Sequence, residues 1–160
     1  MKQIKYCVAV ILYENAERKR FLVVKRPDND PDFGREWGLP ATTSRPGELP
    51  EDVARRICVE KLCCSAKPDR FVGTMFQKRN SYDIYLMDIE MTLTGTTEPD
   101  VFKATTNLTK YIDQQWTDDP MKLSSSARKG SCCASIMLAD RGILQREKWI
   151  SSLEGSKLVA

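Results

Sequence analysis

A charged helix that follows two turns is the part of this chain that most resembles a catalytic site. The stretch EWGLPATTSRPGELPEDVARRICVEKLCC, Glu36 to Cys64, opens with a Trp-Gly-Leu-Pro turn and continues through Pro-Gly to Glu48. Arg56 and Glu60 then stand four residues apart, so their side chains share one face of a helix. The plainer alternative is an ordinary ion pair on a solvated helix, with Glu48 serving only to begin that helix.

Six cysteines form the other set of potentially reactive groups. They lie at positions 7, 58, 63, 64, 132 and 133, and the chain has no histidine. No C-x-x-C pair is present, so the spacing does not predict a zinc site. We expect reduced thiols in a cytoplasmic protein, while a disulfide, a redox role and metal binding are the alternatives.

The helix that carries the charged face is predicted from Pro50 to about Cys64. Its apolar residues recur with helical spacing, and proline suits the first helical position. These apolar residues are Val53, Ala54, Ile57, Cys58 and Leu62. A second helix is predicted over Cys132 to Leu144, with Ser131 as its cap.

Runs rich in β-branched and aromatic residues predict five strands. These cover Ile4–Tyr13, Arg20–Arg26, Arg70–Gln77, Ser81–Leu93 and Tyr111–Thr117. Strands and helices do not alternate steadily, so the predicted fold class is α/β of the α+β type, with a mixed sheet flanked by helices.

Bulk composition favours one domain that spans residues 1–160. The chain is 41% hydrophobic, which allows a sizeable core. Its net charge of +3 comes from 25 basic and 22 acidic residues that are interspersed, which does not indicate a nucleic-acid partner. No stretch approaches the ~20 apolar residues of a membrane span, and no cleavage site follows the apolar run at Cys7–Tyr13, so we expect no membrane association.

The stretch from Glu36 to Cys64 resembles the signature of the Nudix hydrolases, G-x5-E-x7-R-E-U-x-E-E-x-G-U, where U is a bulky aliphatic residue. Without gaps, this box covers residues 42–64: Thr42 falls on the first glycine, Glu48 on the first glutamate, and RICVEKLCC on the second half. FLVVKRP, EWGLPA and PGELPEDVARR also look like the family, and the resemblance extends from about Lys5 to Ile143.

The resemblance implies an α/β/α sandwich that hydrolyses nucleoside diphosphates linked to another group, with Mg²⁺ or Mn²⁺ held by a glutamate cluster. Divalent cations neutralise the pyrophosphate and activate water, and they prefer carboxylate oxygens. Carried over by position, the implied catalytic residues are Glu60, Arg56 and Glu48. The implied metal ligands are Glu60 and a distant acid, Asp113, with Glu98 and Asp100 in the same region.

The box departs from the signature at several positions. Ile57 replaces the first helical glutamate and Lys61 the last, and an ammonium at that place opposes a bound cation. Thr42 and Cys63 replace glycines, which puts the backbone conformation of the loop in question. Leu49 stands where many relatives have a capping serine. We therefore expect metal affinity at this helix to be low.

Candidate ligand-binding residues are aromatic or cationic. Trp37, Phe76 and Trp116, together with Phe33, are candidates for stacking on a base, and Arg26 or Arg35 for facing phosphates. Packing in the core or at its rim is the alternative for each aromatic residue.

Three functional hypotheses follow. The first is a weakly active or inactive Nudix-fold protein that binds a nucleotide-like small molecule or a protein partner, with a homodimer possible. The second is an active magnesium-dependent pyrophosphohydrolase that uses Glu60, Glu48 and a distant acid. The third is a cysteine-based redox or metal module on the same scaffold.

Overall fold

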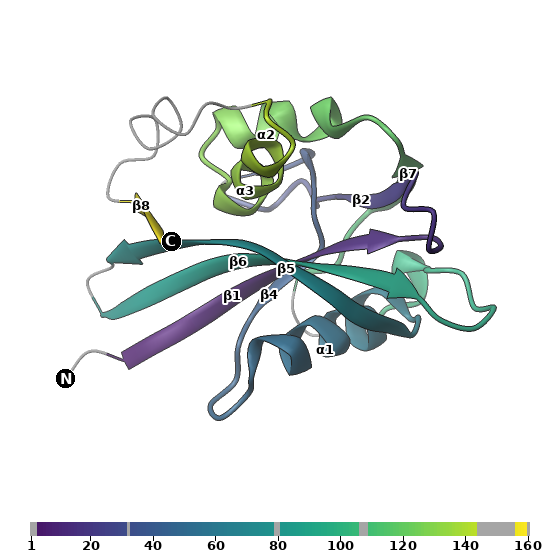
Figure 1. The fold of residues 1–160 in the computed structure, drawn as a ribbon, viewed down its shortest axis with the longest axis horizontal. Coiled ribbons are helices and arrows are strands. Elements are labelled where there is room, and N and C mark those ends of the chain that lie inside the picture. The colour runs from purple at the N-terminus through teal and green to yellow at the C-terminus, as the bar shows by residue number, and fades with distance from the viewer. Residues whose placement is uncertain (1–2, 32, 79–80, 106–108, 144–155, 160) are drawn as a thin grey trace.

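An eight-stranded mixed sheet lies at the centre of the computed structural model, which describes residues 3–31, 33–78, 81–105, 109–143 and 156–159 (Figure 1). The strands are β1 (Gln3–Tyr13), β2 (Phe21–Lys25), β3 (Trp37–Gly38), β4 (Ala41–Thr43), β5 (Ala66–Lys78), β6 (Tyr82–Leu93), β7 (Asp113–Thr117) and β8 (Ser156–Val159). Their order is β3-β2-β1-β6-β5-β8, while β4 pairs with β1 and β7 pairs with β2.

The parallel pair of the sheet joins β1 to β6. These two strands run parallel in continuous register, from Gln3 opposite Tyr82 to Tyr13 opposite Thr92. All other recorded pairs are antiparallel. The connection between β1 and β6 contains the whole box, so this pairing fixes where the box lies relative to the sheet.

Side chains of β1 alternate between two separate parts of the core. Ala9, Ile11 and Tyr13 pack in the cluster that contains the α3 side chains, whereas Val8, Val10 and Leu12 pack in the cluster that contains the α1 side chains. A period of two is what an extended strand covered on both faces requires. Each fully buried aliphatic side chain of this kind contributes about 1.5–3 kcal/mol relative to exposure.

Helices cover both faces of the sheet and make three layers (Figure 1). Helix α1 (Pro50–Leu62) lies on one face, and α2 (Ser124–Arg128) and α3 (Cys132–Asp140) lie on the other. Two short 3-10 helices, η1 (Val101–Lys103) and η2 (Pro120–Leu123), stand in the connections. The expected fold class is confirmed. Among the described residues, no helix is long and apolar enough to cross a membrane.

The predicted elements differ from the observed ones mainly at their ends. The strand expected over 70–77 spans Ala66–Lys78, and the one expected over 111–117 begins at Asp113. The second predicted helix begins at Cys132 and ends at Asp140, and its predicted last residue, Leu144, lies outside the described residues.

Helix α1 ends in an unusual backbone conformation. At the start of the helix, Leu49 precedes Pro50 without a side-chain cap. At its end, Cys63 follows the helix with a φ of 51°, in the left-handed region. The amide of Cys64 then donates to the carbonyl of Cys58 at 3.0 Å. Glycine is the residue that usually occupies this position after a helix, because a Cβ there is strained. The backbone thus keeps a glycine-like turn although the residue is cysteine.

Replacing Cys63→Gly is expected to raise the free energy of unfolding by about 0.5–1 kcal/mol, because it removes this strain at a cost in unfolded-chain entropy. Urea denaturation measures the effect. The control Val59→Gly, at a 63% exposed site within the same helix, should lower stability by about 0.5 kcal/mol. A loss of stability in Cys63→Gly would show that packing of the thiol outweighs the backbone strain.

Candidate functional site

Arg56 organises the charged face of α1. Its Nε and Nη2 donate to the two carboxylate oxygens of Glu48 at 2.9 and 2.8 Å, and Nη2 also donates to the Thr43 carbonyl at 3.1 Å. These hydrogen bonds hold the pKa of the Glu48 carboxyl below its ordinary value, against the opposing effect of burial. The paired fork geometry is the strongest form of this ion pair. Arg56 therefore ties the box loop to the helix.

Glu60 lies between two arginines. Its carboxylate is 3.4 Å from Arg45 Nη2 and 3.5 Å from Arg56 Nη1, and the side chain is 33% exposed. The structure thus brings Glu48, Arg56 and Glu60 together in one cluster. Within it, the guanidinium of Arg56 lies against both carboxylates.

The two replaced glutamate positions are occupied in different ways. Ile57 is 1% exposed and packs in the core on the α1 side of the sheet. Lys61 is 5% exposed, and its Nζ donates to the Ala41 carbonyl at 2.7 Å. The same ammonium lies 5.1 Å from the centre of the Tyr111 ring. Burial lowers the pKa of Lys61 to about 8, and the nearby Arg26 guanidinium adds to that shift.

These side chains do not fit a magnesium site of the kind that the family implies. Magnesium requires several oxygen ligands around one point. Here the arginines engage the two carboxylates, Ile57 offers no oxygen and Lys61 carries positive charge. Among the described residues, no group of three histidine, cysteine or acidic side chains is placed to hold a metal ion.

The distant acids lie on other elements. Asp113 begins β7, where it is opposite Lys25 of β2 and its Oδ1 accepts from the Gln114 amide at 2.8 Å. Asp100 caps η1 by accepting from the Phe102 amide at 2.9 Å, and Glu98 is exposed in the preceding connection. The carboxylates of Asp113 and Asp100 thus each accept a hydrogen bond from a backbone amide of a neighbouring residue.

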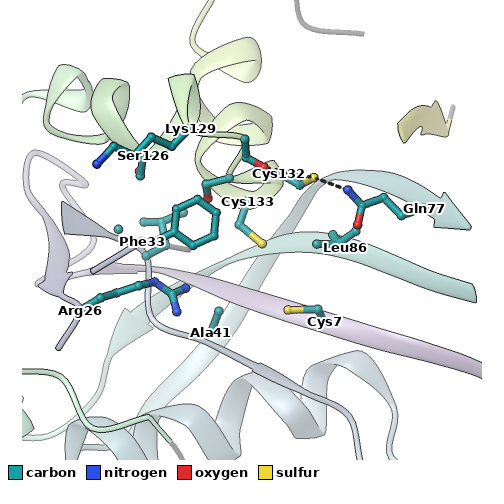
Figure 2. A pocket seen from close by; sticks show the side chains of 14 residues that line it. Cys7, Arg26, Phe33, Ala41, Gln77, Leu86, Ser126, Lys129, Cys132 and Cys133 are labelled. Atoms are coloured by element: carbon teal, nitrogen blue, oxygen red, sulfur yellow. Dashed lines mark hydrogen bonds between the residues drawn. The ribbon is translucent and has the colours of Figure 1, made fainter. Parts of the chain in front are cut away.

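A cavity of about 410 Å³ lies on the opposite side of β1 from α1. Figure 2 shows Arg26 and Phe33 at one end, Cys7, Gln77 and Leu86 on the sheet, and Cys132 and Cys133 on α3. The lining also includes Gly38, Leu39, Ala41, Ser126, Lys129, Gly130 and Ser131. The cavity is therefore lined by the sheet, by the loop before β3, and by α2 and α3.

The loop that brings Arg26 and Phe33 into the cavity wall is held by Asp30. This carboxylate accepts from the Phe33 amide at 2.9 Å and pairs with Arg26 at 3.2 Å. The Arg26 guanidinium also lies 5.5 Å from the centre of the Phe33 ring. A loop too rich in proline and glycine for regular structure is thus fixed by one aspartate.

The other aromatic candidates lie away from this lining. Trp37 packs against the core on the α3 side. The centre of its ring lies 5.7 Å from the Nζ of Lys25 and 5.8 Å from the Nζ of Lys122. Phe76 contacts Tyr85 at 5.1 Å between ring centres, and Trp116 packs against the core on the α1 side.

Arg35 is the remaining cationic candidate. Its side chain is 67% exposed and pairs with Asp28 at 3.6 Å. Of the proposed ligand-binding residues, the structure brings Arg26 and Phe33 to the cavity.

Most of the cavity lining carries no signal in the sequence. Gln77 and Lys129 carried no motif, and Cys7 was noted as a cysteine and as part of a strand but not as a cavity residue. Cys132 and Cys133 had one usable signal, since they begin a predicted helix that is apolar on all sides and is therefore buried. The pKa of the Cys133 thiol is raised by its hydrogen bond with Cys7 and by burial, so this thiol is protonated. No disulfide joins any of the six cysteines, all of which are described.

Comparison with known proteins identifies the family. The NUDIX domain matches residues 4–116, more than half of the chain, and the chain therefore belongs to the Nudix family. A search of the curated proteins finds no match.

Solved structures show the same fold at low identity. The E. coli ORF135 protein is 15% identical with a TM-score of 0.62, over 91% of this chain and 96% of that one. The MutT protein from Methanosarcina mazei Go1 is 15% identical with a TM-score of 0.55, over 78% and 83%. The MutT NUDIX hydrolase from Burkholderia pseudomallei is 17% identical with a TM-score of 0.53, over 73% and 84%.

The Arg56 cluster makes a testable contribution to stability. Arg56→Met is expected to lower the free energy of unfolding by about 1–2 kcal/mol at pH 7, because it removes two charge-assisted hydrogen bonds to Glu48. Since the folded pKa of Glu48 is lowered, this stabilisation is complete above the unfolded value of about 4.3 and is lost as the pH falls below it. Denaturation with urea at neutral and acidic pH measures both effects.

Arg55→Met is the matched control, because Arg55 is 52% exposed and pairs only with Asp52, at 3.4 Å, among the described residues. It should change stability by less than about 0.5 kcal/mol. Equal losses in the two variants would contradict a special role for Arg56.

Proposed function

We propose that this Nudix protein binds a nucleotide-like small molecule in the cavity between the sheet and α3, and hydrolyses it weakly or not at all. The observation that carries the proposal is the state of the two replaced box positions, where Ile57 is buried in the core and Lys61 bonds the Ala41 carbonyl. Magnesium-assisted attack of water on a pyrophosphate needs a cluster of free carboxylates at this turn. The two carboxylates present are paired with arginines.

The ligand side of the proposal rests on the cavity. Its volume of about 410 Å³ suits a small molecule, since such sites commonly measure about 300–1,000 Å³. Phe33 supplies an aromatic ring, Arg26 a cation, and Gln77 an amide that can donate and accept hydrogen bonds. An aromatic face and a cation together suit a flat ring that carries an anionic group.

A panel of nucleoside diphosphates and their derivatives tests this proposal by equilibrium titration. At least one compound should bind, and Phe33→Ala should weaken its binding about tenfold, because stacking on a base contributes about 1–3 kcal/mol. Phe71→Ala is the matched control, since Phe71 is a 55% exposed phenylalanine on β5 outside the cavity lining. Its dissociation constant should match that of the unmodified protein.

The same samples, supplied with Mg²⁺ or Mn²⁺, should release little product. Rapid turnover that is abolished by Glu60→Gln would overturn the proposal and favour an active pyrophosphohydrolase with an altered carboxylate set.

Restoring the box acids tests whether the backbone still suits a metal. The double variant Ile57→Glu with Lys61→Glu should be less stable than the unmodified protein, because it places carboxylates at buried positions. Mg²⁺ at millimolar concentration should then raise its melting temperature by several degrees, since binding to the folded state stabilises it. The unmodified protein should show no such shift. A double variant that folds but ignores Mg²⁺ would show that the loop itself has changed.

A protein partner, including a second copy of the chain, is the second candidate. The observation that favours it is a groove of about 490 Å³ lined by Leu49 and Phe71, which are 65% and 55% exposed. Large exposed apolar side chains around one groove are typical of contact sites. Failure of every compound in the panel to bind would favour this candidate.

A cytoplasmic location is also part of the proposal, because six thiols suit a reducing compartment.

A further inference from the structure

Lys61 differs from the arginines around it because it has no acidic partner. Arg26, Arg45 and Arg56 each form an ion pair with a carboxylate. Among the described residues, none forms an ion pair with Lys61, whose Nζ donates instead to a carbonyl. An ammonium has three donors, so this bond uses one of them. A buried cation without a carboxylate is costly, and an anion that approaches it is strongly favoured.

Ala41 connects this ammonium to the cavity. Its carbonyl accepts from Lys61, and the residue also forms part of the cavity lining. Arg26 lines the same end, and Figure 2 shows its guanidinium directed toward Ala41. The two cations are close enough for Arg26 to influence the ionisation of Lys61. One acid, Asp30, pairs with Arg26, so this end of the cavity keeps an excess of positive charge.

Lys61 occupies the position of the last glutamate in the box signature, so its positive charge lies where the signature has a negative one. Box glutamates are expected to hold a cation that in turn attracts a pyrophosphate. A lysine at the same turn provides the positive charge covalently and replaces one of the acids that a metal would need. At this one position the helix therefore presents a group that attracts anions in place of one that attracts cations.

We propose that Arg26 binds the phosphate group of the ligand and that the Lys61 ammonium, held behind Ala41, supplies a second positive charge beside it, so that anion recognition at this box requires no divalent cation. This inference rests on the proposed binding function and specifies its chemistry. The ligand is a phosphate ester or anhydride whose anionic end lies at Ala41 and whose remainder extends toward Phe33 and α3.

Titration with inorganic pyrophosphate and with ADP, in EDTA and in Mg²⁺, tests the inference. Both anions should bind in EDTA, and Mg²⁺ should not tighten their binding. Lys61→Gln keeps an N–H donor for the Ala41 carbonyl but removes the charge, and it should weaken binding by about tenfold or more. Lys61→Arg keeps the charge and should bind within a few-fold of the unmodified protein.

Lys103→Gln is the matched control, because Lys103 is a lysine on η1 with a side chain 78% exposed. It should not change the dissociation constant. Melting temperatures of all variants separate loss of binding from loss of folding. The Lys61 variants should fold, because the Ala41 carbonyl keeps a second donor, the Tyr111 hydroxyl, at 3.3 Å.

Unchanged affinity in folded Lys61→Gln, or binding that requires Mg²⁺, would overturn the inference. The proposed function fails separately. If adenosine binds as tightly as ADP and Phe33→Ala weakens both, the cavity binds its ligand without Lys61 and only the inference is wrong. If neither nucleosides nor nucleotides bind, the proposed function itself is wrong.

Discussion

The parallel pairing of β1 with β6 is the constraint on which the rest of the molecule depends. Its register is continuous along the full length of β1, and its side chains are buried alternately on the two faces. One face requires α1 as a cover and the other requires α3. Because β4 also pairs with β1, the box loop is attached to the same strand. The helix, the loop and the cavity therefore take their relative positions from one pair of strands.

Within this frame, the charged face of α1 serves partly as structure. Arg56 joins the helix to Glu48 and to the Thr43 carbonyl, which fixes the loop between β4 and α1. Lys61 and the Tyr111 hydroxyl meet at Ala41, whose amide and carbonyl both bond Tyr111. The helix thus holds the loop at two points. Charged groups of the box are used here to connect elements of the fold.

Local pattern was enough to predict five of the eight strands and both main helices, and the box was recognised by its resemblance to the Nudix signature. Apolar residues at helical spacing marked α1, and alternation marked β6. The two-residue β3 and three-residue β4 were not predicted, because such short elements carry no period. The partner of β4 is β1, at the beginning of the chain, whereas β3 pairs with the nearby β2.

Side-chain direction was harder to predict than the elements themselves. Phe76 and Gln77 are neighbours on β5, yet Gln77 reaches the cavity lining while Phe76 packs against Tyr85. Two register shifts in the β5–β6 pairing help decide which residue faces which side, and nothing in the local pattern reveals them. Lys61 was predicted only as a charge that opposes a bound cation, and its burial against β4 and Tyr111 depends on distant parts of the chain.

The bond from Lys61 to Ala41 has a consequence for how such a protein would respond to its surroundings. A metal-loaded box is filled or emptied as the supply of free magnesium changes, and chelators can switch it off. An ammonium fixed to the helix backbone cannot diffuse away. With the positive charge built into the chain, its presence depends on the pH, through the pKa of Lys61 of about 8, and not on the supply of free magnesium.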